Sequence, residues 1–286
     1  MDQPTPTLDA LLPREMARRA EDVGVAKAAL PLLHMAFLAG LAGVFISFGA
    51  VFATTVSTGP GIAFGVARLI AGLAFSLGLI LVSVGGAELF TGNSLIVMAW
   101  ASRRIRTRAV LRNWTVVYVG NFVAAVAIAW IVAQCGQYRS GGGEVGRRAL
   151  DIAAGKVALR FWPAVLLGIC ANVLVCLAVW LCLSARSVID KVACIVFPIT
   201  AFVAAGFEHS VANMYFVPHA LFIKASAPKQ FWTQIGATPA DYPKLTWARF
   251  LGGNLLPVTL GNMIGGSVLV GLVYWMIYLR TPTSNE

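Results

Sequence analysis

The stretches "GGAELFTGN" (residues 85–93) and "GFEHSVAN" (residues 206–213) each interrupt an apolar run that is too long for one simple membrane span. Both mix glycine with a carboxylate. In both, a glutamate is followed five residues later by an asparagine, as Glu88 with Asn93 and Glu208 with Asn213. This matched spacing predicts an internal repeat with a broken helix in each copy.

The composition around these stretches is that of an integral membrane protein. The chain has 286 residues, of which 58% are hydrophobic and 12% charged, with a mean hydropathy of +0.78. Soluble domains carry about twice this share of charge. Apolar runs long enough to cross roughly 30 Å of hydrocarbon lie at residues 30–56, 62–101, 114–134, 161–183, 190–223 and 254–279.

A second matched signature follows each interruption, in "YVGNFVAA" with Asn121 and "TLGNMIGG" with Asn262. Each repeat then holds three spans, so the second copy enters the membrane from the opposite side. The predicted fold is all-α, with six transmembrane spans as two inverted three-span repeats and broken second and fifth helices. Broken helices at matched positions of inverted repeats point to a site near the bilayer midplane, and we expect the breaks to meet around a pore.

The loop "SRRIRTRAVLR" holds five arginines between residues 103 and 112, which places it in the cytoplasm by the positive-inside rule. Both termini are then cytoplasmic. We expect a cytoplasmic amphipathic segment at residues 1–29, one transmembrane domain at 30–280 and a tail at 281–286. The net charge of +10 suits loops facing anionic lipid headgroups or basic vestibules that concentrate an anion, and no nucleic acid is expected.

Glu88 and Glu208 are ionisable groups at membrane depth, where desolvation is costly unless they are paired or hydrogen-bonded. We interpret both as braces that accept backbone N–H groups freed at the breaks. Asn93 and Asn213 belong to the same scaffold, because the repeat pairs them.

His209 aligns with Leu89 in the first break, so the repeat does not explain it. A histidine on an apolar span is often a packed core residue, but beside Glu208 at a helix break it can change charge near neutral pH, and we favour a pore function. Two further groups leave alternatives open. Asn172 suits either an interhelical hydrogen bond or the conduit, and Lys156 either a headgroup anchor or an anion-attracting vestibule.

Several motifs are missing from the chain. It contains no Asn-Pro pair, no P-loop and no HExxH, so neither a cofactor nor a metal site is predicted. An intramembrane serine hydrolase using Ser210 or Ser94 with His209 is disfavoured, because neither serine has a nucleophile-type setting. A receptor-like or structural membrane protein, in which the breaks serve packing, is the alternative of another class; it predicts no ion flux.

The stretches "GGAELFTGN", "GFEHSVANM" and "NLLPVTLGNMIGG" resemble the signatures of the formate/nitrite transporter family. The resemblance implies an aquaporin-like homopentamer in the bacterial inner membrane, with a pore in each protomer and pH-dependent, bidirectional passage of formate. The segment from Ala227 to Asn262 is similar to the formate branch. The ending Gly92-Asn93 is at least as typical of nitrite and hydrosulfide relatives, so another small monovalent anion is the alternative.

The resemblance also implies roles by position. His209 and Thr91 are expected between two constrictions, with Asn172 and Asn262 nearby and Lys156 in the outer vestibule. The cytoplasmic constriction is expected from Phe75, Leu79 and Leu89, and the periplasmic one from Phe90, Val175 and Phe202. We expect a cationic His209 to pair with the anion or to protonate it, so that protons pass with neutral formic acid across the next apolar collar.

Overall fold

The computed structural model describes residues 10–59 and 61–280, and this part of the chain is entirely helical apart from turns and loops. Six of its helices are long and apolar enough to cross a membrane. They are α2 (Leu32–Val56), α3 (Phe64–Gly85), α5 (Thr107–Gln134), α7 (Phe161–Ser184), α8 (Val188–Ala205) and the composite last span (Arg249–Tyr278). The predicted all-α fold with six spans is confirmed.

Shorter helices connect and cover these spans. They are α1 (Pro13–Ala29), η1 (Gly92–Ile96), α4 (Val97–Ala101), η2 (Gln137–Arg139), α6 (Glu144–Ala158), α9 (Ser210–Ser226), α10 (Lys229–Gln234) and η3 (Pro239–Asp241). The last span is divided into η4 (Arg249–Leu255), α11 (Leu256–Met263), η5 (Ile264–Leu272) and α12 (Val273–Tyr278), of which η4 and η5 are π-helical.

Both predicted breaks are present, and the two helices before them end in the same way. At the end of α3, Gly86 has φ +79°, and at the end of α8, Gly206 has φ +80°. A left-handed residue at this position closes a helix and is accessible to glycine at little cost. The chain resumes as η1 and α4 after the first break and as α9 after the second. The second and fifth membrane elements are therefore broken, as predicted.

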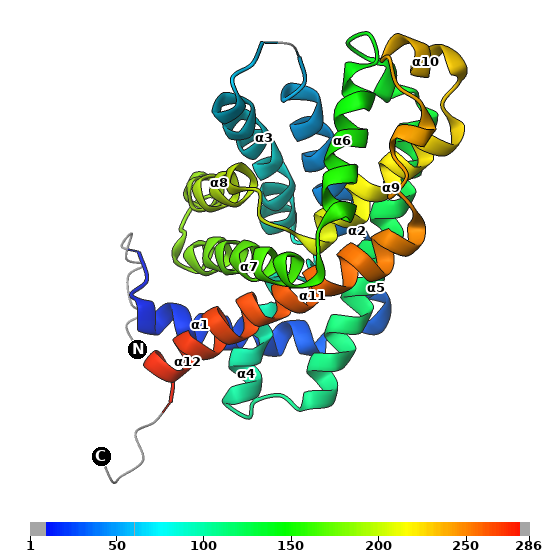
Figure 1. Ribbon diagram of the computed structural model, residues 1–286. Helices are drawn as coiled ribbons and strands as arrows, with labels where there is room; N and C mark the ends of the chain where they lie inside the picture. Colours follow the sequence, from blue (N-terminus) through cyan, green and yellow to red (C-terminus); the bar gives the residue numbers. More distant parts are fainter. Residues whose placement is uncertain (1–9, 60, 281–286) are drawn as a thin grey trace.

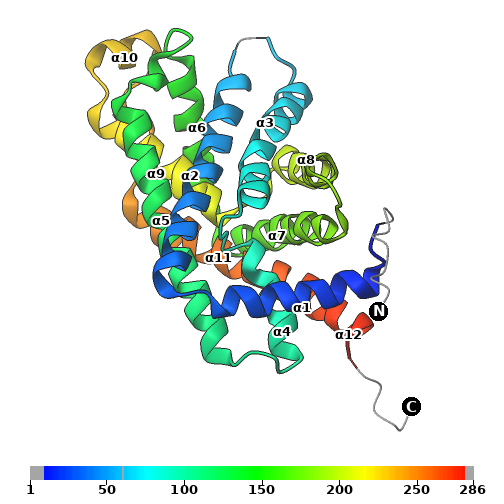
Figure 2. The same cartoon turned by 180° about the vertical axis from the view of Figure 1, so that it is seen from behind.

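Each repeat is longer than the sequence alone suggested, because it begins with an amphipathic helix. α1 precedes α2, α3 and the first break, and α6 precedes α7, α8 and the second break in the same order. The two lie at opposite ends of the molecule: α6 is beside α10, whereas α1 is beside α4 and α12 (Figures 1 and 2). α1 is thus the counterpart of α6 rather than an addition to the domain.

Close helix contacts hold the spans together around the breaks. Gly261 in α11 packs so tightly on α7 that an added Cβ would collide with the Val165 carbonyl oxygen, and Gly43 in α2 is equally close to the Asn121 carbonyl oxygen in α5. Small residues at such crossings let backbones approach in the absence of a hydrophobic driving force. The first and third spans of each repeat are therefore packed backbone to backbone.

Candidate functional site

The first break is held by a chain of buried polar groups. The Glu88 carboxylate accepts from Lys27 Nζ at 2.5 Å and from Asn93 Nδ2 at 2.6 Å, and Asn93 Nδ2 also donates to Asn113 Oδ1 at 2.9 Å. The backbone beyond Glu88 is fixed by Asn121, whose Oδ1 accepts from Phe90 N at 2.9 Å and whose Nδ2 donates to the Glu88 carbonyl oxygen at 3.0 Å. Side chains thus replace the hydrogen bonds that an unbroken helix would make.

The second break repeats this arrangement group for group. Glu208 accepts from Lys156 Nζ at 2.8 Å and from Asn213 Nδ2 at 2.7 Å, and Asn213 Nδ2 donates to Asn254 Oδ1 at 2.8 Å. Asn262 Oδ1 accepts from Ser210 N at 2.8 Å, and its Nδ2 donates to the Glu208 carbonyl oxygen at 2.9 Å. The pairing of Glu88 with Glu208 and of Asn93 with Asn213 is therefore structural as well as sequential.

The donors differ from those we predicted. The two carboxylates accept from lysine and asparagine side chains rather than from freed backbone N–H groups. The N–H groups of Glu88 and Glu208 themselves donate to the carbonyl oxygens of Leu38 and Leu167. A buried carboxylate needs a compensating charge, which a backbone donor does not supply.

Sequence reasoning missed Lys27, Asn113 and Asn254. Their signal was present. Asn113 precedes Asn121 in "NWTVVYVGN" by the same step that separates Asn254 from Asn262 in "NLLPVTLGN". Likewise, Lys27 opens "KAAL" at the end of α1, and Lys156 opens "KVAL" at the end of α6.

His209 caps α9 and is buried, with 2% of its surface exposed. Its Nδ1 accepts from Ala212 N at 3.0 Å, and its Nε2 lies 2.9 Å from Thr91 Oγ1. A backbone N–H can only donate, so Nδ1 is unprotonated and the neutral ring carries its proton on Nε2, which donates to Thr91. The bond joins the second break to the first. The structure thus brings together the two residues that the sequence placed at the pore centre.

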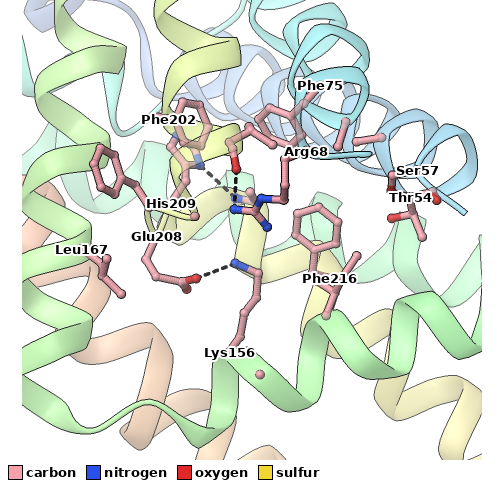
Figure 3. Close-up of a pocket in the computed structure, with 18 of the residues that line it drawn as sticks. Thr54, Ser57, Arg68, Phe75, Lys156, Leu167, Phe202, Glu208, His209 and Phe216 are labelled. Atoms are coloured by element: carbon pink, nitrogen blue, oxygen red, sulfur yellow. Dashed lines mark hydrogen bonds and ion pairs between the residues drawn. The ribbon is translucent and has the colours of Figure 1, made fainter. Parts of the chain in front are cut away.

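Two cavities flank this pair of residues. One, of about 390 Å³, is lined by Lys156, Glu208 and His209, and we name it the Lys156 cavity. The other, of about 300 Å³, is lined by Lys27, Glu88 and Leu89, and we name it the Lys27 cavity. Figure 3 shows the Lys156 cavity, with the ion pair of Lys156 and Glu208 on one side and His209 beside Phe202. We name the lysine, glutamate and asparagine side chains that hold the two breaks the duplicated frame. Each cavity thus contains one glutamate of the duplicated frame.

The cavities lie in sequence along the same helices. On α3, Phe75 lines the Lys156 cavity and Leu79, one turn later, lines the Lys27 cavity. On α7, Leu167 lines the first cavity and Val179 the second, and Val175 lies between them on the same helical face. We name the residues at this boundary the partition; all of them are buried, and they are Phe75, Leu79, Leu89, Thr91, Val175, Phe202 and His209.

The structure regroups the predicted constriction residues. Phe75 packs edge to face against Phe202, with ring centroids 5.7 Å apart, and both line the Lys156 cavity, whereas Leu79 and Leu89 line the Lys27 cavity. Phe75 therefore lies with Phe202 rather than with the two leucines. The Phe90 ring packs on Tyr118, with centroids 4.8 Å apart.

Asn172 and Asn262 are buried beside the partition and bond to backbone. Asn172 Nδ2 donates to the Asn262 carbonyl oxygen at 2.6 Å and lies 3.3 Å from the Thr91 carbonyl oxygen. Asn262 Nδ2 also donates to the Gly168 carbonyl oxygen at 2.7 Å. Asn172 Oδ1 is buried without a partner among the described residues. Asn262 thus supports the second break, and Asn172 ties α7 to both α11 and the first break.

Comparisons with known proteins agree with this arrangement. The family described as Formate/nitrite transporter matches residues 14–276. The formate channel FocA of Escherichia coli (strain K12) is 48% identical over 95% of this chain and 96% of its own, and FocA of Haemophilus influenzae is 41% identical over 92% and 93%. A solved structure described as a pentameric formate channel with formate bound superposes with a TM-score of 0.83 at 46% identity, covering 87% of this chain and 98% of the other. The chain is therefore a multi-pass membrane protein that belongs to the formate/nitrite transporter family.

Proposed function

We propose that this protein carries formate in both directions across the cytoplasmic membrane of a bacterium, through a separate pore in each protomer of a homopentamer. The observation that carries the proposal is the position of His209, whose ring lies buried in the partition between two cavities that each contain basic side chains. The relatives named as formate channels, at 48% and 41% identity, support formate as the substrate.

The partition is a barrier to a bare anion. Its aromatic and aliphatic side chains exclude water, and moving an unpaired carboxylate into such a region is prohibitive. Neutral formic acid avoids most of this cost. The pore therefore needs a group that supplies a proton where the anion meets the partition, and His209 lines the Lys156 cavity at that point.

His209 supplies that proton in its cationic form. The neutral ring carries a proton on Nε2; a second proton at Nδ1 displaces the cap from Ala212, and an anion in the cavity stabilises the resulting cation. Transfer of the Nε2 proton to a formate oxygen leaves a neutral imidazole and formic acid. Formic acid crosses the partition and releases the proton on the other side, so transport depends on pH.

The other predicted residues take roles around this step. The two apolar collars are formed by Phe75 with Phe202 and by Leu79 with Leu89, and Val175 and Phe90 complete them. Thr91, Asn172 and Asn262 hold the substrate path in place, and Lys156 is the basic side chain of the outer vestibule. Glu88, Asn93, Glu208 and Asn213 keep the two breaks in register.

We also propose that both termini are cytoplasmic. The five arginines between residues 103 and 112 support this orientation. The Lys27 cavity then opens to the cytoplasm, and the Lys156 cavity opens to the other side. Residues 1–29 form a cytoplasmic segment, 30–280 the transport domain and 281–286 a cytoplasmic tail; residues 1–9 and 281–286 lie outside the described part of the chain.

A flux assay with purified protein in liposomes tests the function. Formate, nitrite and hydrosulfide are compared over a range of pH for the wild type and for His209→Asn. Asparagine also caps helices well, so the variant keeps the start of α9 while losing the titratable ring. We expect formate flux to fall by about 100-fold, the usual loss on removing a general acid. Wild-type flux with wild-type pH dependence in His209→Asn would show that His209 transfers no proton.

The same assay decides the alternative substrates and the alternative class. A wild-type preference for nitrite or hydrosulfide over formate would move the protein to another branch of its family. No flux of any of the three anions would favour a receptor-like or structural role. Native mass measurement is expected to find five copies, and a stable monomer or trimer would contradict the proposed assembly.

A further inference from the structure

The Lys156 cavity contains a positive charge that the duplicated frame does not account for. Lys156 pairs with Glu208 at 2.8 Å, so much of its charge is already compensated. Arg68, on the first turns of α3, enters the same cavity and forms no ion pair with any described residue. Arg148 and Asp151 also line the cavity, and they carry opposite charges. Arg68 therefore supplies the excess positive charge of this cavity.

The Arg68 guanidinium is held in one position by the second break. Its Nε donates to the Ala204 carbonyl oxygen at 3.0 Å and its Nη2 to the Val203 carbonyl oxygen at 2.6 Å, both at the end of α8. A Cβ on Gly206 would lie 2.7 Å from Arg68 Nη2. A guanidinium has five N–H donors in a planar fork, so these two bonds orient it and leave other donors free. Figure 3 shows it between Phe202 and Lys156, at the centre of the cavity.

The bonds from Arg68 to the last carbonyl oxygens of α8 do not by themselves explain why this position holds an arginine. Arg68 precedes Gly86 by the same number of residues as Val188 precedes Gly206, so Val188 is its counterpart in the second repeat. Val188 is exposed and apolar. Arg68, like His209, is thus a place where the Lys156 cavity departs from the repeat.

The position of Arg68 also suits an encounter with an anion before the partition. Arg68 and Phe75 lie on the same face of α3, two turns apart, and both line the cavity. An anion moving along this face passes Arg68 before it reaches Phe75 and His209. Arginine remains charged at every physiological pH, unlike histidine, and its fork matches the two oxygens of a carboxylate.

We propose that Arg68 is the anion-selecting residue of the Lys156 cavity, where its free N–H donors bind the carboxylate group of the arriving substrate and pass it to His209. In this assignment, Lys156 chiefly stabilises the second break. The inference rests on the proposed function and adds a substrate-binding residue to it. It predicts that Arg68 governs the apparent affinity for small monovalent anions and leaves the protonation step unchanged.

The test measures initial formate uptake into proteoliposomes against formate concentration, at low and at high ionic strength. Arg68→Gln removes the charge and keeps an amide donor; Arg68→Lys keeps the charge without the fork. Arg160→Gln is the matched control, because Arg160 is an exposed arginine outside the cavity. We expect Arg68→Gln to raise the half-saturating formate concentration about tenfold, the usual loss with one charge-assisted hydrogen bond. We also expect it to weaken the salt dependence.

Arg68→Lys is expected to raise the half-saturating concentration by about threefold, less than Arg68→Gln, because it retains the charge and loses the fork. Wild-type half-saturation and salt dependence in Arg68→Gln would overturn the inference. Equal losses in the lysine and glutamine variants would also overturn it, since they would make Arg68 a helix clamp. If Arg68→Gln does not assemble, Arg68→Lys decides alone: a rise of about threefold supports the inference, and either wild-type half-saturation or a tenfold rise contradicts it. Absence of formate uptake by the wild type would instead contradict the proposed function.

Discussion

The two helix breaks of this protein share one frame and differ in what the frame presents. In each, a glutamate lies between a lysine and an asparagine, and a second asparagine fixes the backbone that follows. The residue directly after the glutamate is Leu89 in the first break and His209 in the second. Duplication therefore produced the architecture, and the chemistry lies where the duplicates diverged.

The breaks also differ in how their amphipathic helices are covered. α6 packs beneath the segment between α9 and η4 (residues 227–248), which contains α10 and which we name the excursion. The Tyr242 hydroxyl of the excursion donates to Asp151 Oδ1 in α6 at 3.1 Å, and Phe231 in α10 packs on Tyr138 in η2, with ring centroids 4.9 Å apart. Within residues 10–59 and 61–280, α1 has no such cover and packs instead on η1, α4, α5, α7 and α12. The helix that carries Lys156 is thus held by the excursion, whereas the helix that carries Lys27 is held by the ends of other helices.

The largest effect is expected from breaking the ion pair of one frame. Glu208→Leu leaves Lys156 buried without its partner, which costs about 3–5 kcal/mol for a buried pair. Glu88→Leu should cost less, because the Lys27 side chain is 27% exposed and that of Lys156 only 14%. Thermal unfolding of detergent-solubilised protein measures both.

The double variant Lys156→Met with Glu208→Leu is the control for that comparison. Replacing both charges with apolar groups removes the unpaired ion, so we expect it to be more stable than Glu208→Leu alone. If the double variant unfolds at the same temperature as the single variant, the cost does not arise from the unpaired lysine. In that case the hydrogen bond from Asn213 is the dominant support of the break.

The next effect concerns Phe75 and Phe90, which the family resemblance assigned to opposite constrictions. Phe75→Ala opens the partition on the Lys156 side, where Phe75 packs on Phe202, and we expect the flux of acetate relative to formate to rise by roughly tenfold, the change expected for about 1.4 kcal/mol. Phe90→Ala removes a ring that packs on Tyr118, so a smaller change in selectivity is expected. A larger change for Phe90→Ala would restore the grouping predicted from the sequence.

A smaller effect is expected from the bond that joins the two breaks. Thr91→Val keeps the size of the side chain and removes the acceptor of the His209 Nε2 proton. The loss of one buried hydrogen bond, about 1 kcal/mol, should lower formate flux by roughly fivefold. Thr91→Ser retains the hydroxyl and should behave as the wild type. Equal losses in both variants would indicate a packing defect instead of a missing hydrogen bond.

The smallest effect is expected outside the spans, where the excursion bonds to α6. The Tyr242 hydroxyl donates to Asp151 Oδ1 at 3.1 Å, and burial with the nearby Asp151 charge raises the pKa of Tyr242 to about 12. A raised tyrosine pKa means that the folded state holds the proton more tightly. The stabilising contribution is therefore complete below pH 10, the ordinary value, and is lost as the pH rises towards 12. Tyr242→Phe should abolish this alkaline component of unfolding and little else.

Much of the fold was predictable, because the bilayer imposes a pattern that can be read in one dimension. Spans need about 20 apolar residues, and a carboxylate within such a run needs a structural reason. The glycines, glutamates and asparagines of the two breaks carried that information, so the six spans, the repeat and the broken helices all followed. An amphipathic segment was expected at residues 1–29, where α1 lies, but its counterpart α6 was not, since α6 is amphipathic and too polar to register as a span.

The site was predictable only in part. His209 stood out by its lack of a counterpart, and Thr91, which the family resemblance placed beside it, is its hydrogen-bond partner. Lys27, Asn113 and Asn254 were overlooked although their spacing is repeated. Nothing in the sequence distinguishes them from other lysines and asparagines, because their partners in the breaks are far away along the chain.

Hydropathy and repeated spacing, which are properties of the linear chain, were enough to establish a membrane protein of two inverted repeats in which His209 has no counterpart. Which charges are paired became clear only from the folded molecule. Lys156 is bound to Glu208, Arg68 is bound to carbonyl oxygens, and Phe75 lies beside Phe202. Such facts depend on distances between residues far apart in sequence, and in a medium of low dielectric those distances decide whether a charge is neutralised or free to bind an anion.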